Sequence, residues 1–293
     1  MQNLKKLPLL ILFCFISTLV FSQNKYGLTS TVHGIGEPII LIPGLTSSGS
    51  VWHETISSMS GNYQYHVIEL PGFAGNKPMD DHEGKYLEKI RDGIIQYIQK
   101  NNIKKPAIIG HSLGGFLALT IAIEEPNLLS KLVIVDALPF LPAIRDSSLT
   151  EESATENATH YRAGMMKQAT RPDDEKRAGQ KEFLKWMITS SSNIDIATEW
   201  YMASDNETIA QAMYEMNTTD IRDDLEKINV PALVLGSWIA GKEYGATREG
   251  ALRSYTLQYA NLENLQIDMS DKGKHFIMWD DPDFFIGWLK KFL

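Results

Sequence analysis

The sequence predicts an α/β fold, a mostly parallel sheet flanked by helices, with a helical insertion near its middle. Apolar strand-like runs alternate with helical patterns through most of the chain, which is typical of parallel sheets covered on both faces. The strand pattern is absent between Phe140 and Leu225. A Gly-x-Ser-x-Gly pentapeptide, Gly110 to Gly114, separates an apolar run from an apolar helical stretch. Strand, sharp turn and helix are therefore expected around Ser112.

The first 22 residues have the pattern of a secretory signal peptide. Lys5 and Lys6 precede an apolar run from Leu7 to Phe21, which the small residue Ser22 follows. We expect cleavage to leave Gln23 as the first mature residue and the protein to be exported, to the periplasm or the extracellular space. The alternative is an uncleaved membrane anchor, although the apolar run is shorter than the roughly 20 residues that a spanning helix needs.

Composition and charge limit the function further. With 293 residues, 43% of them hydrophobic, the chain can bury a large core without disulfides or metals. Its only cysteine, Cys14, lies in the leader, so the mature protein has no disulfide. Removing Lys5 and Lys6 takes the formal charge from -8 to -10, which argues against nucleic acid and anionic membranes as partners. The expected partner is a small-molecule substrate.

The expected elements follow in chain order. A short strand over Tyr26–Val32 turns at residues 33–36 into the run Ile39–Ile42, a pattern that predicts a hairpin. Five further runs predict strands: Tyr65–Leu70, Ala107–Ile109, Leu132–Val135, Ala232–Leu235 and Leu265–Met269. Apolar residues at spacings of three and four predict a surface helix between the first and second of these runs, with its inner stripe at Tyr86, Ile90, Ile94, Tyr97 and Ile98.

The insertion divides the chain into a first core segment at 23–139, a helical cap at 140–225 and a second core segment at 226–293. Ser204 and Glu207 have the spacing of a capping box, which predicts a helix start. The insertion is also rich in methionine and aromatic residues: Met165, Met166, Met187, Met202, Met213, Met216, Trp186, Trp200 and Tyr201. They either line an adaptable apolar cavity or simply pack the insertion onto the core.

Ser112 is the candidate nucleophile. Gly110 and Gly114 supply the small flanking residues that a strained strand-to-helix turn needs, and such a turn pushes the hydroxyl clear of the sheet. A serine hydroxyl needs a base within hydrogen-bond reach, and a third group that orients the base. His275 follows the last predicted strand, whose carboxyl end lies at the same sheet edge as Ser112. His111 adjoins the serine and is expected to point elsewhere.

The chain resembles the α/β-hydrolase superfamily over nearly its whole mature length. The matching segments are Ile39–Leu45, Glu69–Phe73, the turn around Ser112, the helical insertion and the late His275. The resemblance implies Ser112 as nucleophile and His275 as general base. It also implies an oxyanion hole formed by the backbone N–H groups of Leu45 and Leu113.

The position of the catalytic acid departs from the common pattern of the superfamily. Relatives commonly place an aspartate soon after the strand that here ends at Leu235, whereas the first carboxylate after Leu235 in this chain is Glu243. Some members, pancreatic lipases among them, carry the acid one strand earlier, where this chain has Asp136. Asp136 is our first candidate and Glu243 the second. The alternative role for Asp136 is to cap the turn that follows it.

The leading function is ester hydrolysis through an acyl-enzyme on Ser112. We expect no metal and no cofactor, because the chain has no H-E-x-x-H pattern, cysteine cluster or phosphate loop. Aminopeptidase, lactonase, carbon–carbon bond hydrolase and cofactor-free haloperoxidase activities use the same three residues and stay open. A catalytically silent ligand-binding protein is the alternative from another class, favoured only by the missing acid after Leu235.

Overall fold

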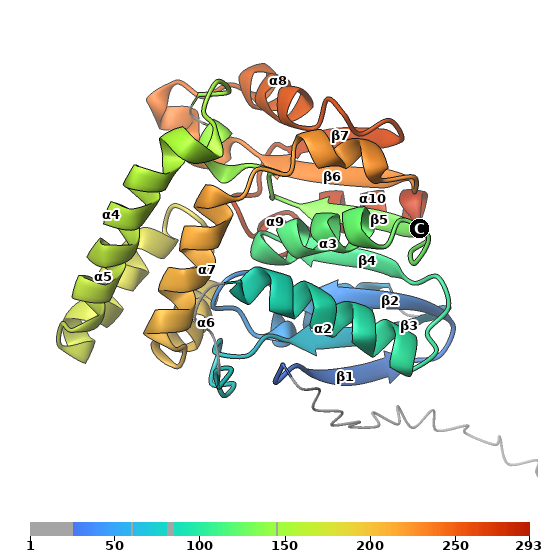
Figure 1. Ribbon diagram of the computed structural model, residues 1–293, viewed down its shortest axis with the longest axis horizontal. Coiled ribbons are helices and arrows are strands. Elements are labelled where there is room, and N and C mark those ends of the chain that lie inside the picture. The colour runs from blue at the N-terminus through green and yellow to red at the C-terminus, as the bar shows by residue number, and fades with distance from the viewer. Residues whose placement is uncertain (1–25, 60, 81–84, 145) are drawn as a thin grey trace, which may run out of the picture.

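The computed structural model describes residues 26–59, 61–80, 85–144 and 146–293, so the leader prediction lies outside the described residues. Within these residues, seven strands form one sheet in the order β1-β3-β2-β4-β5-β6-β7, with β1 antiparallel and the others parallel (Figure 1). The α/β fold with a mostly parallel sheet is thereby confirmed. The strands are Thr29–Gly34, Glu37–Ile42, Tyr63–Glu69, Ala107–His111, Lys131–Val135, Ala232–Ser237 and Leu265–Ser270.

The predicted hairpin between the first two strands is wrong. The chain does reverse at Gly34 to Gly36, but β3 lies between β1 and β2 and pairs with both. Glu37 N donates to Asn62 O, which holds the start of β2 beside β3 from the outset. The half-buried β1 occupies the sheet edge, where one side of a strand lacks a neighbour.

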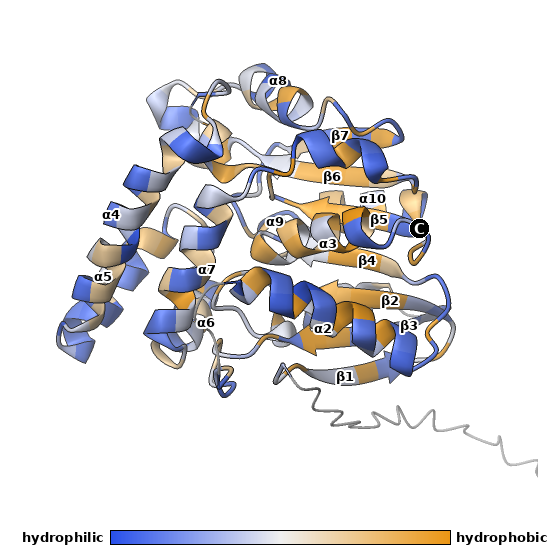
Figure 2. Cartoon of the chain, in the orientation of Figure 1, coloured by the Kyte–Doolittle hydropathy of each residue, from blue (hydrophilic) through white to orange (hydrophobic). Residues whose placement is uncertain are grey.

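Alternate side chains of the central strands enter two separate cores. Ile40 and Ile42 face one core and Ile39 and Leu41 the other, as the period of two in a strand requires. The first core is covered by α2 (Tyr86–Lys100), α3 (Leu113–Glu124) and α8 (Arg248–Gln258). The second is covered by α1 (His53–Ser58), α9 (Ile277–Asp280) and α10 (Pro282–Phe292). Figure 2 shows the apolar central strands between these helices. The predicted stripe of α2 is buried at all five positions.

The described part of the segment between β5 and β6 contains four α-helices beyond the carboxyl edge of the sheet (Figure 1). Here α4 (Glu151–Ala169) packs on α7 (Asn206–Thr218), and α5 (Asp173–Leu184) packs on α6 (Ser191–Met202). The predicted start of α7 is off by one residue. Asp205 caps it by accepting from Thr208 N, while the Ser204 hydroxyl instead donates to Trp200 O. No helix in the described ranges is both long and apolar enough to cross a bilayer.

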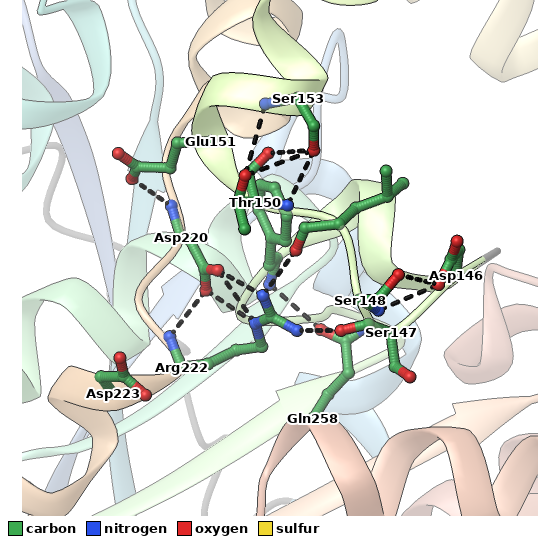
Figure 3. Close-up of polar contacts among 12 residues, drawn as sticks. Asp146, Ser147, Ser148, Thr150, Glu151, Ser153, Asp220, Arg222, Asp223 and Gln258 are labelled. Atoms are coloured by element: carbon green, nitrogen blue, oxygen red, sulfur yellow. Dashed lines mark hydrogen bonds and ion pairs between the residues drawn. The ribbon is translucent and has the colours of Figure 1, made fainter.

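Arg222 joins the two ends of this insertion (Figure 3). Its guanidinium donates to Ser147 O and Leu149 O at the entrance of the insertion, and to both carboxylate oxygens of Asp220 at its exit. Glu151, in the first turn of α4, accepts from Asp220 N. Planar, bidentate contacts of this kind favour arginine over lysine. The insertion is thus held at its base by contacts between its own two ends.

Candidate active site

Ser112 lies at the sharp turn between β4 and α3. Its backbone has φ 53° and ψ -120°, outside the regions that L-residues usually occupy. Such conformations persist only where the surroundings enforce them, and they cluster at functional sites. Ser112 N donates to Val135 O of the next strand, while Ser112 O accepts from the N–H groups of Gly115 and Phe116. The turn is therefore fixed from both sides.

Two glycines make this turn sterically possible. A Cβ on Gly110 would lie 2.2 Å from Gly114 O, and one on Gly114 would lie 2.3 Å from Ile42 O. Both obstacles are backbone atoms, which cannot rotate away. The glycines of the pentapeptide are thus required by close backbone approach, the reason the sequence had indicated.

His275 follows β7 in a loop whose backbone is anchored at several points. The Ser270 hydroxyl donates to the buried Asp281 and accepts from Gly273 N, whose carbonyl accepts from the Ser237 hydroxyl. Asp280 accepts from Lys274 N and from Thr189, just before α6. The loop that carries His275 is therefore tied both to the core and to the insertion.

Asp136 and His275 are in direct contact. His275 Nδ1 lies 2.6 Å from Asp136 Oδ2, and the two side chains are only 19% and 12% exposed. Asp136 stands immediately after β5 with φ 46°. Because an ionised carboxylate only accepts, the bond places the proton on Nδ1 and leaves Nε2 as the basic nitrogen. Ser112 and His275 line one cavity, with no hydrogen bond between their side chains among the described contacts.

The second candidate acid, Glu243, and two carboxylates shortly before His275 in the sequence, Asp268 and Asp271, have other surroundings. Glu243 is exposed in the 3-10 turn Ile239–Tyr244 and is neither a partner of His275 nor a lining residue of the cavity. Asp268 and Asp271 both bind Arg248. The donors to Asp136 come from other elements and not from the turn that follows it.

His111 has a role that the sequence reasoning missed. It is fully buried, its Nε2 donates to His275 O at 3.0 Å, and its ring lies 4.6 Å from both the His275 and Phe276 rings. Burial, and then the neighbouring His275, lower the pKa of His111 well below its usual value. A neutral His111 therefore supports the main chain of the loop that carries His275. Its place directly before the serine was the available signal.

The loop after β2 presents the predicted oxyanion-hole donor. Among the described hydrogen bonds, the N–H groups of Leu45 and Leu113 have no partner, and Leu113 opens α3, where N–H groups lack intrahelical acceptors. Glu69 anchors the same loop by accepting from Gly49 N and Ser48 Oγ. Burial raises the pKa of Glu69, a second residue whose role in the site the sequence did not reveal.

A cavity of about 410 Å³ extends from Ser112 into the insertion. Four of the six methionines noted in the sequence line it, together with Tyr201. Trp200 instead packs on Trp279, with ring centroids 5.5 Å apart. Three lining side chains, Ile144, Tyr161 and Phe183, are about half exposed and mark an apolar mouth. In the part of the chain that the structure describes, no three His, Cys, Asp or Glu side chains are placed to hold a metal ion.

Comparison with known proteins identifies the class that this fold and site define. The model of the alpha/beta hydrolase fold family matches residues 37–229. The chain belongs to the alpha/beta hydrolase family.

Particular relatives include esterases. A segment of 108 residues is 31% identical to the pimeloyl-[acyl-carrier protein] methyl ester esterase of Vibrio cholerae and covers 37% of this chain and 40% of that relative. Among solved structures, an esterase from Exiguobacterium antarcticum matches with a TM-score of 0.72 at 14% identity, covering 90% of this chain and 94% of that one. An enol-lactonase from Burkholderia xenovorans matches with a TM-score of 0.70 at 16% identity. The match covers 90% of this chain and 95% of the enol-lactonase. At these identities the two structures show the shared fold alone.

Proposed function

We propose that the protein is a serine hydrolase that cleaves carboxylic esters through an acyl-enzyme on Ser112. The observation that carries the proposal is the His275–Asp136 hydrogen bond beside the strained Ser112, at the base of one cavity. In this role Ser112 is the nucleophile, His275 the general base and Asp136 the acid. The pimeloyl-[acyl-carrier protein] methyl ester esterase among the sequence relatives supports this activity.

The mechanism follows from the tautomer. His275 Nε2 takes the proton of the Ser112 hydroxyl as Oγ attacks the ester carbonyl. The N–H groups of Leu45 and Leu113 donate to the oxyanion, and each such donor contributes about 3 kcal/mol to stabilising the transition state. His275 then protonates the departing alcohol. The same histidine then deprotonates a water molecule, which attacks the acyl-enzyme. The carboxylic acid product leaves, and the histidine returns the proton to the Ser112 hydroxyl.

The cavity favours a small to medium apolar ester as the small-molecule substrate. Met165 and Met213 contribute flexible thioether side chains from facing helices, and such side chains adapt to acyl groups of different shape. Export through cleavage after Ser22 is part of the proposal and is tested by sequencing the N-terminus of the protein recovered outside the cytoplasm. A new terminus at Gln23 is expected, and retention of Met1 would contradict it.

A panel of substrates tests the activity. Nitrophenyl esters of increasing acyl length, lactones and aminoacyl amides are compared, with fluorophosphonate labelling of Ser112 and Ser112→Ala as the control. Ester turnover with labelling that Ser112→Ala abolishes is expected. Preferred turnover of lactones would make the protein a lactonase. A folded protein that neither labels nor turns over any substrate would be a ligand-binding member of the family.

The role of Asp136 is tested by comparing Asp136→Asn with Glu243→Gln. Asp136→Asn replaces one carboxylate oxygen with an NH2 group, which cannot accept from His275 Nδ1 and favours the wrong tautomer, so kcat is expected to fall by about 10³- to 10⁴-fold. Glu243→Gln is expected to stay within about twofold of the parent, because Glu243 is exposed and takes part in none of the hydrogen bonds described for Asp136 and His275. The opposite ranking of the two variants would reassign the acid.

A further inference from the structure

The Asp136 carboxylate is held by three donors from three different elements. Oδ2 accepts from His275 Nδ1, and Oδ1 accepts from Ser237 N at 2.8 Å and from the Tyr255 hydroxyl at 2.7 Å. Ser237 ends β6, while Tyr255 lies on α8. Two donors on Oδ1 leave the carboxylate little freedom to rotate, so Oδ2 stays directed at His275.

The Tyr255 hydroxyl is in a position that water cannot readily take over. Tyr255 is 5% exposed, and the Asp136 side chain is 12% exposed. Burial, and then the Asp136 charge, raise the pKa of Tyr255 well above its usual value, so the hydroxyl keeps its proton and remains a donor. A hydrogen bond to an ionised acceptor is also stronger than one between neutral groups.

Asp136 needs such support because of its place in the fold. It stands at the end of β5 in a left-handed conformation, φ 46°, that few residues other than glycine tolerate. The backbone N–H of Asp136 donates to Leu235 O of β6. The backbone thus fixes where the side chain begins, and the two donors on Oδ1 orient the carboxylate so that Oδ2 faces His275.

We propose that Tyr255 is a positioning residue of the active site, whose hydroxyl aims Asp136 at His275. The proposal rests on the proposed function, since Asp136 is its acid. Tyr255 acts on the reaction through Asp136: it keeps Oδ2 on the Nδ1 proton and so keeps Nε2 free to take the proton of Ser112.

The chain contains a matched control for this hydroxyl. Tyr259 lies one helical turn further on, is 1% exposed, and stacks on Tyr255 with ring centroids 6.5 Å apart. Its hydroxyl donates to Ala137 O at 2.8 Å and not to the carboxylate. Tyr255→Phe and Tyr259→Phe therefore each remove one buried hydroxyl and one hydrogen bond, but only the first changes the partners of Asp136.

The test compares steady-state kinetics of the two variants on the best ester of the panel. Tyr255→Phe is expected to lower kcat by about 10- to 100-fold with KM changed less than about twofold, because orientation of the base matters in the transition state and not in substrate binding. Tyr259→Phe is expected to keep the kcat of the parent. Equal kcat values for the two variants, or a change confined to KM, would overturn the proposal.

Proton NMR provides a readout that does not depend on turnover. The His275 Nδ1 proton, in its short bond to Asp136, is expected to resonate far downfield, and His275→Gln assigns the signal. Tyr255→Phe is expected to move or broaden this signal, whereas Tyr259→Phe leaves it in place. An unmoved signal in Tyr255→Phe would contradict the proposal even if no ester were hydrolysed. Absence of turnover and labelling in the parent, by contrast, would refute the proposed function.

Discussion

Three residues that follow the carboxyl ends of central strands have unusual backbone conformations. Thr46, Ser112 and Asp136 all have positive φ, between 46° and 60°, and they follow three adjacent strands, β2, β4 and β5. Strain of this kind is maintained by surrounding structure and is concentrated where function requires it. For Ser112 the flanking glycines predict the strained turn from the sequence. For Asp136 no neighbouring residue predicts the positive φ.

Glycine substitutions test the steric argument. Gly114→Ala is expected to lower the free energy of unfolding by about 1–3 kcal/mol, because the new Cβ would meet two backbone carbonyl oxygens. Gly164, within α4, has open space around its Cα, so Gly164→Ala is expected to raise it by about 0.5–1 kcal/mol. Urea unfolding measures both. Similar effects of the two substitutions would contradict the steric argument.

At the level of elements, α7 of the insertion supplies the N-terminal cap of α2, a helix of the core. The residue before α2, Lys85, has φ 61° and its side chain caps nothing. Instead the buried Glu215 of α7 accepts from Tyr86 N at 2.6 Å and from Leu87 N at 2.7 Å. A carboxylate at a helix N-terminus satisfies free N–H groups and interacts favourably with the helix dipole. The insertion is thus joined to the core by a cap that is remote in sequence.

Removal of this cap is expected to destabilise the protein. Glu215→Ala leaves two N–H groups of α2 unpaired, and the free energy of unfolding is expected to fall by about 2–4 kcal/mol. Glu152, exposed on α4, serves as the control, and Glu152→Ala is expected to stay within about 0.5 kcal/mol of the parent. Denaturant titrations compare the two. A loss for Glu215→Ala no larger than for the control would show that the cap does not stabilise α2.

In the whole molecule, two apolar cores enclose the sheet, and the candidate active site lies between the carboxyl edge of the sheet and the insertion. Folding at this scale also buries titratable groups. Burial lowers the pKa of His66 from 6.5 to about 4, and its ring is paired with Tyr97 and Gln64. Between about pH 4 and 6.5, His66 therefore binds a proton in the unfolded chain but not in the folded protein.

This difference predicts a loss of stability in acid. Because the pKa of folded His66 lies below the unfolded value, its contribution is fully present above about pH 6.5 and is lost as the pH falls toward 4. Between about pH 7.5 and 4.5, the free energy of unfolding of the parent is expected to fall by about 2 kcal/mol more than that of His66→Gln. Urea titrations at both pH values measure it. Equal losses in the two proteins would show that His66 does not couple folding to protonation.

The sequence by itself determined the α/β class, the approximate position of every strand and the sharp turn at Ser112. The periodicity of hydrophobic residues and the spacing of glycines are local properties, so they can be recognised without the fold. The oxyanion-hole roles of Leu45 and Leu113 stay predictions, as do the catalytic roles of the other site residues. Only the tertiary structure decided that β3 separates β1 from β2, that Asp136 and not Glu243 meets His275, and that Tyr255 and His111 support that pair. The pairing of β1 with β3 joins residues 30 to 40 positions apart, and the contacts around Asp136 and His275 join residues more than a hundred positions apart. No local pattern encodes such contacts, because they form only once the sheet has assembled.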